Sequence, residues 1–133
     1  MSVDTLSNLF SSIKNASMRR KKTVEVPYSK LSEAVLKVIR DKGFIADVRV
    51  FKEKDTQFKA IAVDLKYEAL NMPAISNIER VSKPGLRIYK KASDLENVRS
   101  GLGFYVVSTP KGVLPSNEAR KRKLGGEVIC KIY

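Results

Sequence analysis

The sequence contains no histidine and a single cysteine, and each scarcity excludes a class of chemistry. Without histidine there is no Ser-His or Cys-His catalytic pair, and zinc and iron lose one of their commonest ligands. One cysteine, Cys130, allows no internal disulfide and is compatible with a reducing compartment. Because Cys130 follows Val128 and Ile129 in an apolar run, we expect a buried, inert thiol. The composition therefore predicts no catalytic site, no metal and no cofactor.

Long apolar runs are also missing. No stretch approaches the roughly 18 consecutive apolar residues of a membrane helix. The opening MSVDTLSNLFSSIKN lacks the apolar region and cleavage site of a signal peptide, and its Asp4 is unlike an acid-poor transit peptide. We therefore expect no membrane-spanning helix and a protein that stays where it is made.

What the sequence has in excess is positive charge. It holds 26 Lys and Arg against 14 Asp and Glu, a net charge of +12. A charge of this size indicates a polyanionic partner, which is RNA, DNA or an anionic membrane surface. Residues 80–133 carry 12 basic and 4 acidic side chains, against 14 and 10 in residues 1–79. We expect the anion-binding face in the C-terminal part.

The N-terminal half predicts the order helix, strand, helix, strand, strand. Apolar residues recur at helical spacing in two segments, which contain Val3, Leu6, Leu9, Phe10 and Ile13, and then Leu31, Ala34, Val35, Val38 and Ile39. Ser29 is the expected N-cap of the second helix, and Gly43 its left-handed stop. Alternation predicts strands at 23–26, 45–51 and 61–67, with a hairpin loop at 52–57.

Residues 68–77 form a candidate linker between two small domains, 1–68 and 76–133. The second domain is expected to be mostly β with short helices, so the predicted fold class is α+β, with two small α/β domains. Lys83-Pro84-Gly85-Leu86 fits a type II turn with a positive φ at Gly85. Ser93 begins a capping-box pattern for a short helix that stops at Gly101, and Ser116 is the expected cap of a helix through Lys123.

One candidate binding segment is the end of the strand at 104–107. It leads into Ser108, Thr109, Pro110, Lys111 and Gly112. Hydroxyl groups donate and accept hydrogen bonds, so they can pair with base edges and with the RNA 2′-OH. Glycine allows a backbone to approach a ligand closely. The alternative is a loop that only ends a strand.

A second candidate is a run of cations next to two glycines, Arg120, Lys121, Arg122, Lys123, Leu124, Gly125, Gly126 and Glu127. Four consecutive cations can hold phosphates through binding that weakens steeply with salt, although a solvated charged face is the plain alternative. The glycines permit a sharp turn. Glu127 would accept a hydrogen bond from a base amino group or hold a neighbouring cation in place. The plain alternative is an ordinary carboxylate at the start of a strand.

Two further basic segments stand out. The segment RVSKPGLRIYKK at 80–91 places five cations around Tyr89, which would stack on an unpaired base if exposed; packing in a sheet is the alternative. The run at 18–22 is suited to a phosphate backbone and has nothing that selects a sequence.

Several motifs together resemble a known family. RVSKPGLRIYK at 80–90, GLGFYVVSTPKG at 101–112 and LGGEVICKIY at 124–133 are similar to the bacterial form of small-subunit ribosomal protein S-eight. The resemblance extends into the N-terminal half through Asp4, residues 13–16, 27–31 and 42–45, and it covers essentially the whole chain in one register.

This resemblance implies two small α/β domains and binding to an irregular helix in the central domain of small-subunit ribosomal RNA. It implies contacts at Ser108, Thr109, Lys111 and Gly112, at Gly125, Gly126 and Glu127, and at Arg87 and Tyr89. The family's loop commonly has a third hydroxyl residue where this chain has Pro110, which removes a hydroxyl and an amide donor. Thr5 also replaces the family's opening proline.

The leading hypothesis is a non-catalytic RNA-binding protein of the small subunit, in the cytoplasm or in an organelle, with neighbouring ribosomal proteins as further partners and no membrane partner. Lys and Arg would supply affinity, and Ser108, Thr109 and Glu127 selectivity. A second hypothesis is repression of its own operon messenger through the same surface. An enzyme acting on RNA or nucleotides is disfavoured because histidine, paired carboxylates and a P-loop are lacking. A DNA-binding protein is weaker still, because no helix-turn-helix or basic-leucine pattern appears in the sequence.

Overall fold

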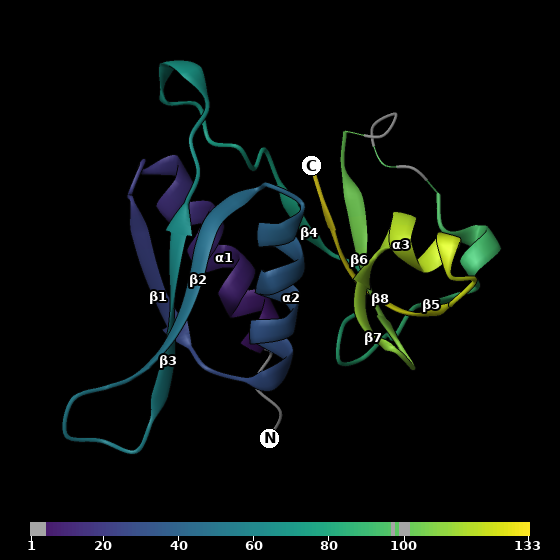
Figure 1. Ribbon diagram of the computed structural model, residues 1–133, viewed down its shortest axis with the longest axis horizontal. Coiled ribbons are helices and arrows are strands. Elements are labelled where there is room, and N and C mark those ends of the chain that lie inside the picture. Colours follow the sequence, from purple (N-terminus) through teal and green to yellow (C-terminus); the bar gives the residue numbers. More distant parts are fainter. Residues whose placement is uncertain (1–4, 97, 99–101) are drawn as a thin grey trace. The chain divides into compact units, whose positions relative to one another are not determined.

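The computed structural model describes residues 5–96, 98 and 102–133. The chain forms two compact units, Thr5–Ile75 and Ser76–Tyr133 (Figure 1). Each unit combines helices with an antiparallel sheet, which confirms the predicted α+β class. Among the described residues, no helix is long and apolar enough to cross a membrane.

The N-terminal unit has the predicted α-β-α-β-β order. Its elements are α1 (Thr5–Met18), β1 (Thr23–Pro27), α2 (Lys30–Asp41), β2 (Ile45–Lys52) and β3 (Lys59–Leu65). The short 3-10 helix η1 (Ala69–Asn71) follows in the segment predicted as a linker. The strands lie in the order β1-β3-β2, and both pairings are antiparallel. Helix α1 starts at Thr5, so threonine in place of proline leaves this helix intact.

Helix α2 begins and ends as its sequence predicts. The Ser29 hydroxyl accepts a hydrogen bond from the Ser32 amide at 3.0 Å, which satisfies one free donor of the first turn. Gly43 takes a φ of +85°, and the Phe44 amide donates back to the Ile39 carbonyl at 3.2 Å. These contacts form a Schellman C-cap, for which glycine is the favoured residue.

The helices bury one face of the N-terminal sheet. The buried apolar side chains come from both helices and all three strands and include Leu6, Leu9, Phe10, Ile13, Val26, Val35, Leu36, Ile39, Val48, Ile61 and Val63. Burying each large side chain stabilises the fold by about 1.5–3 kcal/mol. The prediction was wrong for Leu31, which is 40% exposed because the buried stripe of α2 begins at Ser32. Val3 lies outside the described residues.

The opposite face of this sheet carries a small polar network. The Thr23 hydroxyl donates to the Asp64 carboxylate at 2.8 Å, and Arg49 forms an ion pair with the same oxygen at 2.8 Å. The hydrogen bond from Thr23, together with the Arg49 guanidinium, lowers the pKa of the Asp64 carboxyl.

In its described residues, the C-terminal unit contains five strands and short helical segments. The elements are β4 (Ile78–Arg80), β5 (Tyr89–Lys90), η2 (Ala92–Asp94), β6 (Phe104–Thr109), β7 (Gly112–Pro115), α3 (Ser116–Lys121) and β8 (Gly126–Ile132). The strand order is β4-β8-β6-β7, and β5 also pairs with β8. Strand β8 therefore pairs with three other strands. Strand β7 was not predicted, because its four residues directly precede a helix.

Three predicted details of this unit are wrong. Gly85 has no positive φ, so the turn closed by Lys83 and Leu86 is not type II. Ser93 lies inside η2 and the following Leu95 is extended, which excludes a capping-box helix there; its predicted stop, Gly101, lies outside the described residues. Ser116 is the first residue of α3 rather than its cap, because its hydroxyl accepts from the Tyr105 amide at 3.0 Å.

Both faces of the C-terminal sheet have buried apolar positions. Val107 and Val128 pack with Leu95 and Ala119, so α3 and the segment after η2 cover that face. Cys130 is completely buried, as predicted, and this burial raises the pKa of its thiol far above the ordinary value. Such a thiol is a packing group and a poor nucleophile.

Candidate nucleic-acid interface

A row of three polar side chains crosses the C-terminal sheet. In the strand register, Tyr89 of β5 lies opposite Glu127 of β8, and Glu127 lies opposite Ser108 of β6. Residues directly opposite each other project from the same face of a sheet. These three residues therefore form one surface row, on the face opposite Val107, Val128 and α3. We call Tyr89, Glu127 and Ser108 the polar row.

Each member of the polar row is accessible to a ligand. Tyr89 is 69% exposed, so its ring is available for stacking, and the alternative of packing inside the sheet is wrong. Ser108 is half-buried, and its hydroxyl makes no hydrogen bond within the described part of the chain. A free hydroxyl in the same row as an exposed aromatic ring is suited to an unpaired base and its sugar.

Glu127 forms an ion pair with Arg87. The distance from Arg87 Nη1 to Glu127 Oε2 is 3.2 Å, and the arginine side chain remains 51% exposed. Holding a neighbouring cation is one of the roles that the sequence left open for Glu127. The pair fixes the guanidinium beside the polar row, where its other N–H groups can donate to phosphate or to a base edge.

The hairpin between β6 and β7 ends beside the polar row. Thr109 lies opposite Gly112, which leaves Pro110 and Lys111 as the two central residues of the turn. Proline presets the φ that the first central position needs. Gly112 has a φ of +116°, a conformation that other residues rarely adopt. Pro110 therefore stiffens the loop, and Lys111 is exposed at its tip.

The neighbouring hydroxyls of Ser108 and Thr109 have different environments. Thr109 is only 9% exposed. Its hydroxyl donates to the Gly112 carbonyl at 2.7 Å and accepts from the Lys111 amide at 3.2 Å. Thr109 thus holds the turn together, whereas Ser108 presents its hydroxyl on the other face.

Gly125 and Gly126 allow close packing at the start of β8. A Cβ on Gly126 would lie 2.0 Å from the Ser108 carbonyl oxygen, and a Cβ on Gly125 would lie 2.6 Å from the Lys90 carbonyl oxygen. Neither glycine has a positive φ; the sharp turn instead falls at Lys123, whose φ is +56°. The glycines thus bring β5, β8 and β6 close enough to form the polar row.

The four consecutive cations have separate roles. Arg120 donates from Nη1 to the Leu95 carbonyl at 2.5 Å, and Arg122 pairs with Glu118 at 2.9 Å. Lys121 and Lys123 are exposed. Arg120 and Lys123, together with Ala92 and Ser93, line an open hollow of about 460 Å³. The cluster is therefore partly structural, and its two lysines are the groups best placed for phosphate.

One residue missed by sequence reasoning supports the loop before β5. Ser82 is 1% exposed, and its hydroxyl accepts from the Ile88 amide at 2.9 Å and donates to the Ile88 carbonyl at 3.3 Å. These bonds fix the base of the loop that carries Arg87. The signal that could have found Ser82 in the sequence was its position just before the Lys-Pro-Gly turn.

The basic run at 18–22 belongs to the N-terminal unit. Arg20 has a φ of +55° and donates from Nε to the Asn71 carbonyl at 3.2 Å, and the Tyr67 hydroxyl donates to the Lys21 carbonyl. Arg19, Lys21 and Lys22 remain exposed on this fixed loop.

Comparison with known proteins gives one consistent match. The family described as Ribosomal protein S8 matches residues 4–133. The small ribosomal subunit protein uS8 of Chloroflexus aurantiacus is 44% identical over 130 residues, which cover 98% of this chain and 97% of that protein. The uS8 proteins of Alcanivorax borkumensis and Microcystis aeruginosa are 45% and 41% identical over 129 and 132 residues, with at least 96% of each chain covered.

Proposed function

Because the chain belongs to the ribosomal protein S8 family, we propose that it is a structural constituent of the small ribosomal subunit. The match confirms the resemblance predicted from the sequence motifs. The family is non-enzymatic. We further propose that the protein binds the central domain of small-subunit ribosomal RNA through its C-terminal domain, residues 76–133, in the cytoplasm and during assembly of the subunit.

The observation that carries this proposal is the polar row, together with exposed cations elsewhere in the same unit. Arg87, Lys111, Lys121 and Lys123 are exposed in the same unit as Tyr89 and Ser108. Cations supply affinity for any RNA, whereas a stacking ring and a free hydroxyl distinguish unpaired from paired nucleotides. Because the major groove of A-form RNA is too narrow for side chains, such a surface favours a bulged or otherwise opened helix.

The contacts divide into selective and non-selective groups. Ser108, Tyr89 and the Arg87–Glu127 pair would recognise the irregular site. Lys111, Lys121 and Lys123 would contact phosphates, while Thr109, Gly112, Gly125 and Gly126 fix the backbone that carries the selective groups. Arg120 and Arg122 would contribute mainly through the charge they leave exposed.

The direct test is binding of the purified protein to a central-domain RNA fragment and to a fully paired duplex of equal length. Ser108→Ala should weaken binding to the fragment about threefold to tenfold, the loss of one hydrogen bond, and leave duplex binding nearly unchanged. Ser11→Ala, at an exposed serine of α1, is the matched control and should change neither.

Charge reversal should have the opposite signature. Lys121→Glu with Lys123→Glu should weaken binding to both RNAs and flatten the salt dependence by about one unit of slope per lost contact. If Ser108→Ala and the double reversal weaken both RNAs in the same proportion, the proposed division of contacts is wrong. Nuclease footprints of the protein on whole small-subunit RNA should fall in the central domain.

The operon messenger remains an alternative ligand for the same surface. If the messenger carries a copy of the irregular helix, it should compete with the ribosomal fragment, and Ser108→Ala should weaken both complexes equally. A messenger complex that is insensitive to Ser108→Ala would require another surface.

A further inference from the structure

The N-terminal sheet has one face that its helices do not cover. Val26, Ile61 and Val63 point to the helices, so alternation places Glu25, Pro27, Ala60, Ala62 and Phe51 on the other face. The outward residues of the central strand β3 are Ala60 and Ala62, with Asp64 of the polar network beyond them. Ala60 is short, and the longer side chains around it on β1 and the β2–β3 hairpin leave room above it.

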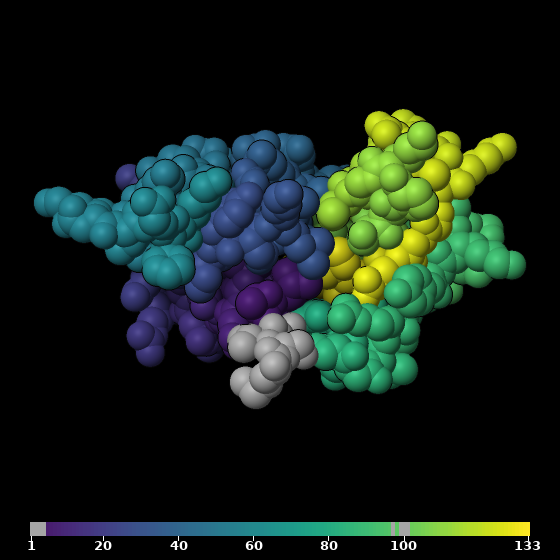
Figure 2. All heavy atoms as spheres, turned by 90° about the horizontal axis from the view of Figure 1, so that it is seen from below, coloured from purple at the N-terminus to yellow at the C-terminus, as the bar shows by residue number. Residues whose placement is uncertain are grey.

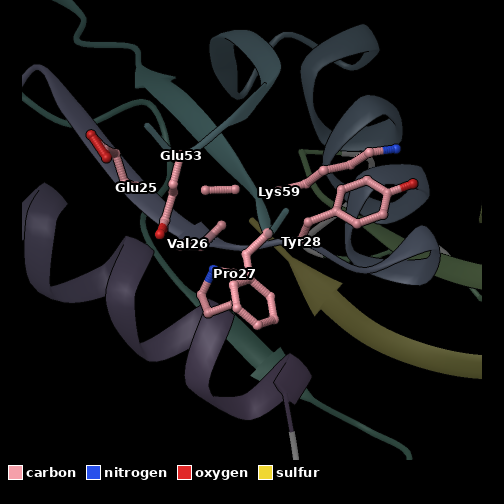
Figure 3. Close-up of a pocket in the computed structure, with 8 residues that line it drawn as sticks. Glu25, Val26, Pro27, Tyr28, Glu53 and Lys59 are labelled. Carbon is pink, nitrogen blue, oxygen red and sulfur yellow. The ribbon is translucent and has the colours of Figure 1, made fainter. Parts of the chain in front are cut away.

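The β2–β3 hairpin, between Lys52 and Lys59, projects from the unit (Figure 2). There the structure has an open hollow of about 410 Å³ lined by Glu25, Val26, Pro27, Tyr28, Glu53, Phe58, Lys59 and Ala60 (Figure 3). We call this the hairpin hollow. Phe58 at its rim is 74% exposed. A single exposed apolar residue is ordinary, but a phenyl ring beside an apolar hollow suits an apolar side chain from a partner.

The charges of the hairpin hollow have the opposite sign to those of the protein as a whole. Neither the Glu25 nor the Glu53 carboxylate forms an ion pair within the described chain. Their side chains lie on one side of the hollow, with Tyr28 and Lys59 on the other (Figure 3). The Lys59 ammonium lies 5.2 Å from the centre of the Tyr28 ring, a cation–π contact. Two unpaired carboxylates repel phosphate and attract a cationic ligand.

The position of β1 suits an extended ligand. Strand β1, which contributes Glu25 to Pro27, lies at the edge of the sheet order β1-β3-β2. An edge strand has backbone groups free to pair with an added peptide strand. An extended peptide on this edge would project alternate side chains toward the face that carries the hairpin hollow.

We propose that the hairpin hollow binds an extended, Lys- and Arg-rich peptide segment of a neighbouring protein, with one apolar side chain against Phe58. The cations of the segment would pair with Glu25 and Glu53. This inference rests on the proposed function, because the neighbour is another protein of the ribosomal particle. It gives the N-terminal unit a protein-binding role distinct from RNA binding by the C-terminal unit.

The test is photo-crosslinking in assembled small subunits. Phe58→p-benzoylphenylalanine keeps an aromatic ring at an exposed position, so it should not disturb folding. After irradiation, mass spectrometry should identify a crosslinked protein segment with several Lys or Arg residues within a few positions of the attachment site. Tyr89→p-benzoylphenylalanine, in the polar row, should crosslink to ribosomal RNA in parallel samples.

The carboxylates are tested in the same background. Glu25→Gln together with Glu53→Gln should reduce the crosslink yield at position 58 at least about threefold, because the cations of the bound segment lose both carboxylates with which they pair. Glu68→Gln, an exposed carboxylate of the same unit outside the hollow, is the matched control and should leave the yield unchanged.

The outcomes separate the two proposals. If position 89 crosslinks to RNA while position 58 crosslinks to RNA, to a second copy of this chain, to an acidic or uncharged segment, or to nothing, the docking proposal fails and the proposed function stands. An unchanged yield in the double glutamine variant also overturns the docking proposal. If neither variant chain enters the particle although both fold, the proposed function fails and the docking proposal fails with it.

Discussion

Replacing Gly126 by alanine should damage the fold and the proposed RNA-binding surface together. The added Cβ would lie 2.0 Å from the Ser108 carbonyl oxygen, 2.8 Å from the carbon of that carbonyl and 3.2 Å from the Thr109 Cα. All three atoms belong to the backbone, so no side chain can rotate away. Strand β6 must move by more than an ångström relative to β8. Overpacking of this kind typically destabilises a protein by about 1–3 kcal/mol.

The same displacement should weaken RNA binding beyond the loss of stability. Ser108 would move away from its position opposite Glu127, and hydrogen bonds weaken steeply when donor and acceptor are displaced. We expect roughly a tenfold weaker complex with the central-domain fragment, which corresponds to about 1.4 kcal/mol. Urea unfolding followed by circular dichroism would give the stability, and filter binding at fixed salt would give the affinity.

Gly85→Ala is the matched control. Gly85 has no positive φ, and a Cβ there would meet nothing within 4 Å. Alanine should leave stability unchanged or raise it by about 0.4–1 kcal/mol, because the unfolded chain loses freedom. Equal unfolding midpoints for Gly126→Ala and Gly85→Ala would refute the packing argument. A destabilised Gly126→Ala that retains full RNA affinity would refute the role of the polar row.

Three further predictions concern other sites. Lys123→Gly should raise stability by about 0.5–1 kcal/mol, because it removes a lysine in the left-handed conformation at the end of α3. It should also lower the salt slope of RNA binding by about one, because one cation is lost. A fall in stability would contradict the conformational argument. The lowered pKa of Asp64 means that its stabilising contribution is complete above the ordinary value of 3.8 and is lost as the pH falls through the lower folded value. Asp64→Asn should therefore reduce the loss of unfolding free energy at acid pH, measured by urea unfolding at several pH values. If the variant loses as much stability in acid as the native protein, the proposed contribution of the Thr23–Asp64–Arg49 network is wrong. In the native protein, Cys130 should react with iodoacetamide roughly a hundredfold more slowly than in urea, and equal rates would show that the thiol is accessible.

Local patterns in the sequence predicted most of the N-terminal unit. The cap at Ser29 and the stop at Gly43 depend on residues within one turn of the chain, so spacing and residue type are sufficient to place them. The predicted burial of Leu31 was wrong because the direction of a helix's buried stripe depends on what packs against it. The same limit explains Ser116, whose hydroxyl bonds to the backbone of a strand rather than to its own helix.

The proposed binding surface was less predictable because its geometry depends on strand register. The sequence identified Tyr89, Glu127 and Ser108 as candidates, but only the pairing of β5, β8 and β6 brings them into one row. The sequence also treated Ser108 and Thr109 alike, although alternation puts them on opposite faces and turn formation uses the Thr109 hydroxyl. Adjacent residues of similar chemistry can differ in this way because side-chain direction in a strand changes at every residue.

The central place of β8 determines when the proposed RNA-binding surface is formed during translation. Strands β4, β5 and β6 all pair with β8, yet β8 is synthesised after them. Until Glu127 and its neighbours have left the exit tunnel, Tyr89 and Ser108 have no common partner that aligns them. The nascent chain should therefore remain unable to select its RNA until synthesis has passed β8, although the N-terminal unit can fold much earlier.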